Sequence, residues 1–282
     1  EAALARSTHV SMSMRQLDLC TGSGCVAITM ARQRPTAPVY AGDLSADALG
    51  LNLDQADSAA IAVELIHAYS LIHDDLPAMD DDGLRRGKPS THIQFGEALA
   101  ILAGDALQAA AFQTLSEDEL LDPAARLRLI QALSTASGIQ GMVGGQVHDM
   151  AGEHQGLSLS ALTEMHALKT GALIEFSAAS AAIIASNQRI EPLLRAFGAQ
   201  LGLAFQVQDD ILDETSSTET LGKQQGSDRA QAKSTFVSLL GLEAAQNHLA
   251  DLIQTAVKLL QQSQLETDNL LALAHYMVER KH

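Results

Sequence analysis

Five aspartates, Asp74, Asp75, Asp80, Asp81 and Asp82, fall within nine residues. Carboxylates about 4 Å apart repel by roughly 1 kcal/mol in water and about 4 kcal/mol near a protein surface, so solubility alone does not explain this concentration. The proline at position 77 ends regular helix near Asp75, which places Asp80 on a turn that can fold back towards Asp74. Mg²⁺ suits such a set, because it binds carboxylate oxygens together with substrate phosphates.

A second acidic cluster lies at positions 205–213. Asp209 and Asp213 are four residues apart, so on a helix they share one face and are displaced by only about 40°. Gln206 and Gly202 fall on that same face. An amide and a patch of bare backbone therefore adjoin the carboxylates.

Cationic and hydroxyl side chains accompany both clusters. They are Arg85, Arg86, Lys169, Thr170, Lys223 and Lys233. An isolated aspartate run is more often a solvated helix cap, and each basic residue alone would more often balance charge in an acidic chain. Two clusters, each attached to an apolar helix and accompanied by cations, instead favour a diphosphate cradle, in which cations neutralise the outer phosphate oxygens.

The elements that must position these clusters are helices. Positions 61–72 are apolar on every face, which predicts a buried helix that leads into the first cluster. Further helices of three or more turns are expected at 96–115, 123–140, 158–185, 191–214 and 233–262. Residues from about 56 to 282 are therefore predicted to form an all-α domain.

The first 55 residues have a different texture. A short strand at 17–19, a turn at 21–24, a helix start at 25–31 and a second strand at 39–41 form a β-turn-α-β pattern. Two strands cannot bury both faces of a sheet, so residues 1–55 are interpreted as a fragment rather than an independent domain. Cys20 and Cys25 are interpreted as small apolar residues, not as ligands.

The composition restricts the partners and the location. The chain of 282 residues carries 18 Lys+Arg against 34 Asp+Glu, a formal net charge of −16, which repels phosphate backbones, so no nucleic-acid partner is expected. No uncharged apolar run reaches the roughly 18 residues of a membrane span, and positions 1–6 do not resemble a secretory signal. A cytoplasmic protein is expected.

Residues 67–82, together with Arg85, Arg86 and Gly87, resemble the first aspartate-rich motif of trans-prenyl diphosphate synthases, and in particular of bacterial farnesyl diphosphate synthases. The segments that follow in the family's order and spacing are Gly145-Gln146, Lys169-Thr170-Gly171, residues 202–213 and Leu221-Gly222-Lys223. The resemblance covers residues 56–282. It implies an isoprenoid-synthase-type helical bundle around a central cavity, in which an allylic diphosphate (dimethylallyl or geranyl) is ionised and condensed with isopentenyl diphosphate to give farnesyl diphosphate.

The resemblance also implies roles for single residues and a homodimeric assembly. Mg²⁺, for which Mn²⁺ can substitute, would be held by Asp74, Asp80, Asp209 and Asp213, with Asp75 in support, and would act as a Lewis acid. The allylic diphosphate would contact Arg85, Lys169, Thr170, Gln206, Lys223 and Lys233, and Arg86 would face isopentenyl diphosphate. The residues expected to carry catalysis are Asp74, Asp75, Asp80, Lys169 and Asp209.

Tyr69 lies five residues before Asp74, about 7.5 Å along a helix at 1.5 Å per residue. It is either an ordinary core tyrosine or a floor that stops the growing prenyl chain. Tyr69, together with the two extra residues inside the first motif, resembles the pattern of bacterial synthases that stop at fifteen carbons.

Two alternatives come from the N-terminal part. Residues 15–50 resemble a fragment of S-adenosylmethionine-dependent protein-glutamine methyltransferases, with Asp43 placed to bind ribose hydroxyls, but no Pro-Pro pair supplies that family's catalytic segment. Residues 1–60 also lack the Gly-Gly-Lys-Arg-x-Arg-Pro segment that binds isopentenyl diphosphate in synthases. The nearer alternative is therefore a truncated, catalytically impaired synthase-like protein that binds only the allylic diphosphate, and a methyltransferase is a remote one.

Overall fold

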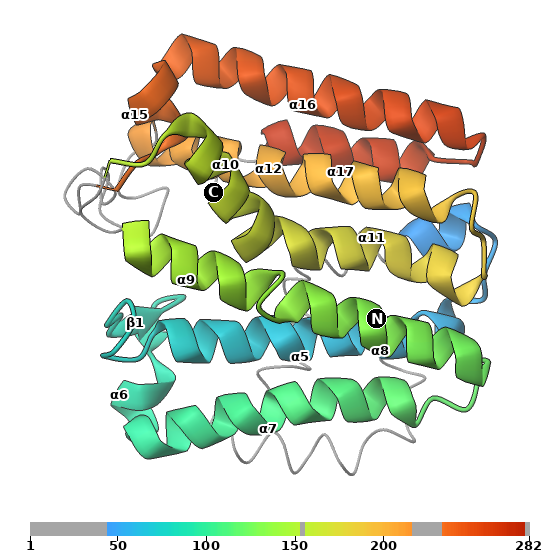
Figure 1. The fold of residues 1–282 in the computed structure, drawn as a ribbon, viewed down its shortest axis with the longest axis horizontal. Coiled ribbons are helices and arrows are strands. Elements are labelled where there is room, and N and C mark those ends of the chain that lie inside the picture. Colours follow the sequence, from blue (N-terminus) through green and yellow to red (C-terminus); the bar gives the residue numbers. More distant parts are fainter. Residues whose placement is uncertain (1–43, 153–155, 216–232, 280–282) are drawn as a thin grey trace.

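A computed structural model describes residues 44–152, 156–215 and 233–279. Within these ranges almost all regular structure is helical, which confirms the predicted all-α class (Figure 1). The predicted strands at 17–19 and 39–41 lie outside the described residues, as does Lys223.

Long helices build the molecule, and most of them run along or against one common direction (Figure 1). They are α5 (Asp57–Asp74), α7 (Glu97–Ser116), α8 (Pro123–Ser137), α9 (Met142–Gly152), α10 (Leu159–His166), α11 (Ala172–Ile184), α12 (Glu191–Thr215), α16 (Leu242–Ser263) and α17 (Asp268–Glu279). The short elements are η1 (Leu53–Gln55), the antiparallel strands β1 (Leu84–Arg85) and β2 (Lys88–Pro89), α6 (Thr91–Phe95), the π-helical turn η2 (Ala167–Gly171) and α15 (Phe236–Leu240).

Each predicted helical stretch falls on an observed helix, and two of the stretches are interrupted. The stretch predicted at 233–262 is divided at Gly241 into α15 and α16, because the φ of +82° at Gly241 is incompatible with a continuous helix. The stretch predicted at 158–185 contains the turn η2. The β1–β2 hairpin was not predicted.

Two apolar clusters form the core. One lies around α12, α16 and α17 and contains Phe197 and Leu249. The other lies around α5, α7, α8 and α11 and contains Leu107 and Phe176. Because α5 packs against α7, α8 and α11, it is covered on several sides, which explains why its sequence is apolar all round. This buried helix ends at Asp74, the first residue of the first aspartate cluster.

Helical residues 44–48 pack against the bundle. Ala46 is fully buried beside Ala56 and Ala181, and the side-chain amide of Asn269 donates a hydrogen bond to Asp47 at 3.1 Å. These contacts attach the segment before α5 to the main domain, while the division of the chain at residue 55 stays a prediction.

Two helical stretches, Glu97–Ser116 and Leu159–Ile184, have the length and composition of a membrane span. In its most apolar window the second is 61% buried inside the protein and the first 33%. Length and composition alone are weak evidence, since the buried core helix of a globular protein is also apolar on all sides. The absence of a membrane span stays a prediction.

Candidate active site

The first aspartate cluster lies where α5 ends. The helix stops at Asp74, three residues before Pro77, as the sequence predicts. The chain then turns back, and the backbone N–H of Asp80 donates a hydrogen bond to the carbonyl oxygen of Asp74 at 2.9 Å. Asp74 and Asp80 therefore lie side by side at the end of α5, which confirms the predicted return of the chain.

Asp74 carries its charge in an unfavourable environment. Burial raises the pKa of Asp74 to about 6; Lys169 opposes this rise, Asp80 adds to it, and Arg85 and Asp75 have smaller effects. A partly buried carboxylate beside like charges is stabilised by a cation placed next to it. Asp74 and Asp80 thus bring two carboxylates to the end of α5, where a cation would favour the charged form of Asp74.

Asp75, unlike Asp74, is paired directly with an arginine. Its side chain is 3% exposed, and Arg85 reaches it with Nε at 2.9 Å and with a second guanidinium nitrogen. The turn residues of the β1–β2 hairpin, Arg86 and Gly87, both have positive φ (55° and 74°), as a two-residue hairpin turn requires. This hairpin returns Arg85 to α5, so the Asp75–Arg85 ion pair fixes the hairpin beside the first cluster.

The second cluster occupies the last turns of α12. Gln206 donates from Nε2 to Oδ2 of Asp209 at 3.4 Å, and its Oε1 accepts a hydrogen bond from Oγ1 of Thr170 at 3.0 Å. Asp210 instead accepts a hydrogen bond from the backbone N–H of Phe236 at 2.6 Å. Gln206 and Asp209 therefore share the face directed to Thr170, while Asp210 ties α15 to α12.

The π-helical turn η2 lies between α10 and α11 and packs against α9 and α12. Such wider turns are frequently found at functional sites. On α12, Gly202 faces η2, and a Cβ at that position would lie 2.6 Å from Cα of Gly171. Only a glycine permits this approach, so the bare backbone predicted beside the carboxylates serves to seat η2.

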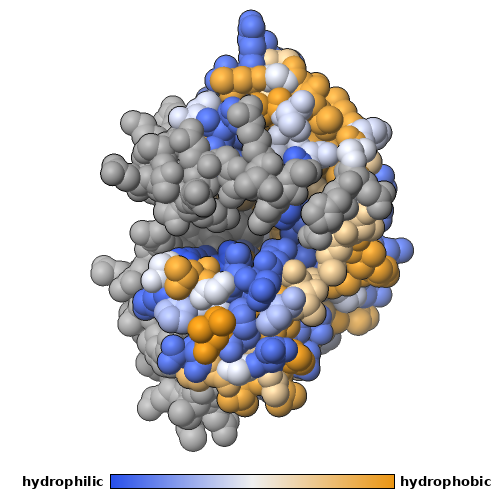
Figure 2. Space-filling model, turned by 90° about the vertical axis from the view of Figure 1, so that its left-hand side faces the viewer, coloured by the Kyte–Doolittle hydropathy of each residue, from blue (hydrophilic) through white to orange (hydrophobic). Residues whose placement is uncertain are grey.

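Consecutive residues of η2 face different clusters. Lys169 lies close enough to Asp74 and Asp80 to interact with both charges, while Thr170 bonds to Gln206 of the second cluster. The two clusters therefore belong to one site, at the end of the molecule where α5, α9 and α12 finish (Figure 1). Figure 2 shows this end, with hydrophilic side chains gathered near the middle of the view, where the surface is hollowed.

The oxygen donors of this site suit Mg²⁺. In the part of the chain that the structure describes, no three His, Cys, Asp or Glu side chains are close enough to hold a metal by themselves. Mg²⁺ rarely needs such a cage, because it keeps several waters and is usually bound by one or two carboxylates plus substrate phosphates. Burial is the main cause of the raised pKa of Asp74, against the opposing effect of Lys169, and a cation shared with a phosphate-bearing substrate would further favour the charged carboxylate.

The structure also describes three other predicted site residues, Asp213, Lys233 and Arg86. Asp213 is half-buried one helical turn beyond Asp209, and Lys233 is half-buried in the segment before α15. Arg86 is exposed on the hairpin. Burial and, after it, the charge of Arg86 lower the pKa of His67, which lies two helical turns before Asp74. Lys223 lies outside the described residues.

Tyr69 lies in the apolar core below the first cluster. Its ring is 6% exposed and meets the His73 ring edge-on, with 5.7 Å between ring centroids. Burial raises the pKa of Tyr69, and Gln108 acts in the opposite direction, yet no described atom has hydrogen-bond geometry to its hydroxyl. Both interpretations of Tyr69 therefore remain open. The structure also shows that its hydroxyl oxygen is buried in the apolar core.

Two buried histidines make stability depend on pH. Burial lowers the pKa of both His67 and His166 to about 4, and Arg86 also lowers that of His67. Each neutral imidazole therefore contributes stability above pH 6.5, its ordinary pKa, and this contribution is lost as the pH falls through about 4.

We expect His166→Asn to weaken this dependence, so that the free energy of unfolding falls less between pH 7 and about pH 4.5 than in the parent protein. Urea titrations at the two pH values measure the difference. His275 is exposed, and His275→Asn is the matched control. Equal pH dependence in the parent and in His166→Asn would contradict the prediction.

Asp149 is a site residue that the sequence did not predict. Nζ of Lys169 donates a hydrogen bond to Oδ2 of Asp149 at 2.5 Å. Asp149 lies on α9, four residues after Gly145 of the quoted Gly145-Gln146 segment, and this spacing places both on one helix face. The spacing of Gly145 and Asp149 could have indicated that Asp149 belongs to the site. Its partner, Lys169, could not be predicted, because the two residues meet only where α9 packs against η2.

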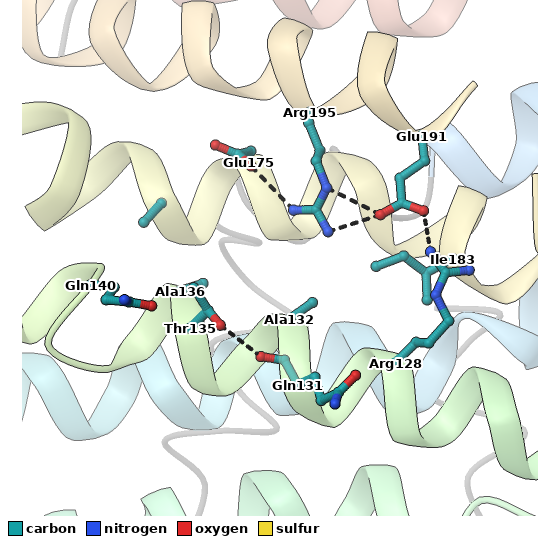
Figure 3. A pocket seen from close by; sticks show the side chains of 11 residues that line it. Arg128, Gln131, Ala132, Thr135, Ala136, Gln140, Glu175, Ile183, Glu191 and Arg195 are labelled. Carbon is teal, nitrogen blue, oxygen red and sulfur yellow. Dashed lines mark hydrogen bonds and ion pairs between the residues drawn. The ribbon is translucent and has the colours of Figure 1, made fainter. Parts of the chain in front are cut away.

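A pocket of about 540 Å³ lies apart from the aspartate clusters, between α8, α11 and α12 (Figure 3). Arg195 bridges Glu175 at 3.1 Å and Glu191 at 3.0 Å, and Arg128 pairs with the other oxygen of Glu191. Figure 3 shows these four side chains pointing to one another from three helices. These ion pairs connect α8, α11 and α12. The pocket contains neither of the two aspartate clusters.

A helical bundle with two aspartate clusters at one end, joined through a lysine–threonine pair, defines the class of helical enzymes that act on prenyl diphosphates. The model of the polyprenyl synthetase family matches residues 32–273. The chain belongs to this family.

Relatives and solved structures agree with this assignment. The chain is 50% identical over 238 residues to the farnesyl diphosphate synthase of Escherichia coli (strain K12), which covers 82% of this chain and 80% of that protein. The geranylgeranyl pyrophosphate synthetase of Pyrococcus horikoshii has a TM-score of 0.83 at 28% identity, over 99% of this chain and 97% of that one. The geranyltransferase of Helicobacter pylori, complexed with magnesium and isoprenyl diphosphate, has a TM-score of 0.76 at 31% identity, over 94% and 93%.

These findings confirm the predicted family and the isoprenoid-synthase fold. They give no support to the resemblance between residues 15–50 and methyltransferases, since the family match already begins at residue 32.

Proposed function

We propose that this chain is a Mg²⁺-dependent prenyltransferase that condenses dimethylallyl or geranyl diphosphate with isopentenyl diphosphate to give farnesyl diphosphate. The observation that carries the proposal is the pair of aspartate clusters at one end of the bundle, linked through Lys169 and Thr170. The 50% identity to a farnesyl diphosphate synthase supports the product. A neighbour that holds magnesium and isoprenyl diphosphate supports the metal and the class of substrate.

The metal would be held from two sides, by Asp74 and Asp80 at the end of α5 and by Asp209 and Asp213 on α12. These hard oxygen donors accept Mg²⁺ and also Mn²⁺. When bound, the metal supplies Lewis-acid stabilisation of the charge that develops on the departing diphosphate. Asp75 supports this side of the site through its ion pair with Arg85.

Cationic side chains would neutralise the remaining phosphate oxygens. In an acidic chain with a formal net charge of −16, an anionic substrate needs them. The residues proposed to contact the allylic diphosphate are Arg85, Lys169, Thr170, Gln206, Lys223 and Lys233, and Arg86 is proposed to face isopentenyl diphosphate. No side-chain base is proposed. The departing pyrophosphate would take the proton that the condensed carbocation loses when its double bond forms.

The apolar part of the site would protect the carbocation. Water would convert an allylic cation into an alcohol, so the prenyl chain needs a dry wall. Tyr69, Ile72 and Leu76 on the last turns of α5 and beyond are at most 9% exposed and pack with Leu107 and Phe176. This cluster begins directly below Asp74, where the prenyl chain of a bound diphosphate would enter.

Tyr69 is proposed as the floor that limits the product to fifteen carbons. We expect Tyr69→Ala to lengthen the product, because removing the ring opens space below the first cluster. Mass spectrometry of the dephosphorylated products measures the chain length. Tyr276 is 59% exposed, and Tyr276→Ala serves as the control. An unchanged product from Tyr69→Ala would return Tyr69 to the role of a core residue.

We also propose that the protein is a cytoplasmic homodimer that pairs through α7. Leu99 and Leu102 on this helix are 56% and 61% exposed, and contiguous exposed apolar patches often mark protein–protein contacts. Sedimentation velocity is expected to give twice the chain mass for the parent protein and the mass of a single chain for Leu102→Lys. A parent protein that sediments as a single chain would contradict the proposed assembly.

The deciding experiment for the activity uses isotopically labelled isopentenyl diphosphate, geranyl diphosphate and Mg²⁺ with the purified chain. The expected result is a labelled fifteen-carbon diphosphate whose formation stops when the metal is chelated. Mg²⁺-dependent binding of geranyl diphosphate without condensation would overturn the proposal and support the impaired synthase-like alternative.

A further inference from the structure

One face of α9 is shaped around Lys169. Gly145 and Asp149 are four residues apart on this helix and therefore lie on the same face. A Cβ on Gly145 would lie 2.5 Å from Cα of Lys169, so any larger residue would displace the backbone of η2. The same helix face thus receives the backbone of Lys169 at Gly145 and its side chain at Asp149.

The ion pair between Lys169 and Asp149 is shielded from water. Nζ and Oδ2 are 2.5 Å apart, and the two side chains are 23% and 17% exposed. Although burial acts to lower it, the pKa of Lys169 lies above its usual range, because Asp149 and, after it, Asp74 and Asp80 favour the charged form. The ammonium therefore stays charged at neutral pH.

Three carboxylates compete for this ammonium. Lysine is a compact point charge on a flexible stem, and both Asp74 and Asp80 attract it from the first cluster. If Lys169 paired with them, it would occupy the cation position that the aspartates offer. Asp149 attracts the ammonium from a separate element, α9, and uses one of its three N–H donors.

We propose that Asp149 is a positioning residue that holds the Lys169 ammonium away from Asp74 and Asp80, with two N–H donors left for a substrate diphosphate. This role rests on the proposed function. Asp149 itself touches no reacting atom in this scheme; it acts through Lys169, and Gly145 makes the approach of η2 to α9 possible.

Steady-state kinetics with geranyl diphosphate test the role. Asp149→Asn keeps the shape and removes the charge, and we expect kcat to fall roughly 10- to 100-fold, as is typical when the supporting partner of a site residue is lost. We expect KM to change little, because the lost orientation of Lys169 is offset by the removal of a negative charge beside an anionic substrate. Asp149→Glu, which keeps the charge, is expected to recover part of kcat.

The matched control for these kinetics is Asp251→Asn, at an exposed position on α16, which is expected to leave kcat and KM unchanged. A raised KM with unchanged kcat in Asp149→Asn would overturn the role. So would a lower melting temperature with unchanged kcat, or a Glu variant no more active than the Asn variant.

A second readout does not depend on activity. Limited acylation of amines followed by mass spectrometry reports the reactivity of each lysine, and we expect Lys169 to react several-fold faster in Asp149→Asn, while the exposed Lys258 is unchanged. Equal labelling of Lys169 in both proteins would overturn the ion pair in solution. Faster labelling in a chain that transfers no prenyl group would leave the ion pair standing and overturn the proposed function, and with it the role of Asp149.

Discussion

Asp74→Asn is expected to reduce kcat for prenyl transfer by about 10³-fold, the loss typical when one group that stabilises developing charge is removed. The amide keeps the shape of the side chain but loses the charge that would hold the metal beside the diphosphate. Asp80 lies next to Asp74 through the 2.9 Å backbone hydrogen bond, so one carboxylate remains and the loss stays finite.

The same substitution is expected to stabilise the metal-free protein. The pKa of Asp74 is raised from 3.8 to about 6 in the fold, so this carboxyl group favours folding fully below pH 3.8, and that contribution is lost as the pH rises through about 6. At pH 7.5 the ionised Asp74 therefore destabilises the protein, by an amount on the order of 2 kcal/mol. An asparagine carries no such charge.

Both effects are measured on one preparation: kcat with saturating substrates, and urea unfolding in the presence of a chelator at about pH 7.5. Asp251→Asn, on the exposed side of α16, is expected to change neither. Activity within tenfold of the parent would contradict the metal-holding role. A destabilised metal-free Asp74→Asn protein would contradict the electrostatic explanation.

Arg85→Gln is expected to lower the free energy of unfolding by about 3 kcal/mol, because it removes the partner of a buried carboxylate, Asp75. Asp75 is 3% exposed on its side chain and depends on two nitrogens of Arg85. Without them a carboxylate is left in the protein without its counter-charge. The hairpin would also lose its attachment to α5.

A double-mutant cycle checks this explanation by urea unfolding. The double variant Asp75→Asn with Arg85→Gln is expected to recover most of the lost stability, since no buried charge remains uncompensated. Lys88→Gln, at an exposed position on the same hairpin, is expected to change stability by less than about 0.5 kcal/mol. A double variant as unstable as Arg85→Gln would show that packing of the arginine, and not the ion pair, stabilises the hairpin.

The cycle also separates stability from substrate binding. Arg85 is 28% exposed and contacts Asp82 at 3.3 Å as well as Asp75, so part of its guanidinium still faces solvent. If Arg85 also contacts the diphosphate, we expect the double variant to recover stability and still to have a higher KM for geranyl diphosphate than the parent protein.

The helices and the position of the aspartates on them could be predicted from the amino-acid sequence. The spacing of apolar residues is a local property with a period of 3.6 residues, so α5, α7, α8 and α12 were predicted within a few residues of their ends. The same local rule placed Gln206 and Asp209 on one face of α12, and Pro77 predicted the end of α5.

Which charges pair with one another depends on how the helices pack. Asp75 and Arg85, Asp149 and Lys169, and Asp210 and Phe236 are 10, 20 and 26 residues apart, and no helical period relates residues on different elements. Neighbouring aspartates therefore look equivalent in the chain, yet burial raises the pKa of Asp74 while Asp75 is paired with Arg85 of the hairpin. The turn η2 has the same origin, since close packing of Gly202 against Gly171 and of Gly145 against Lys169 seats it between α12 and α9.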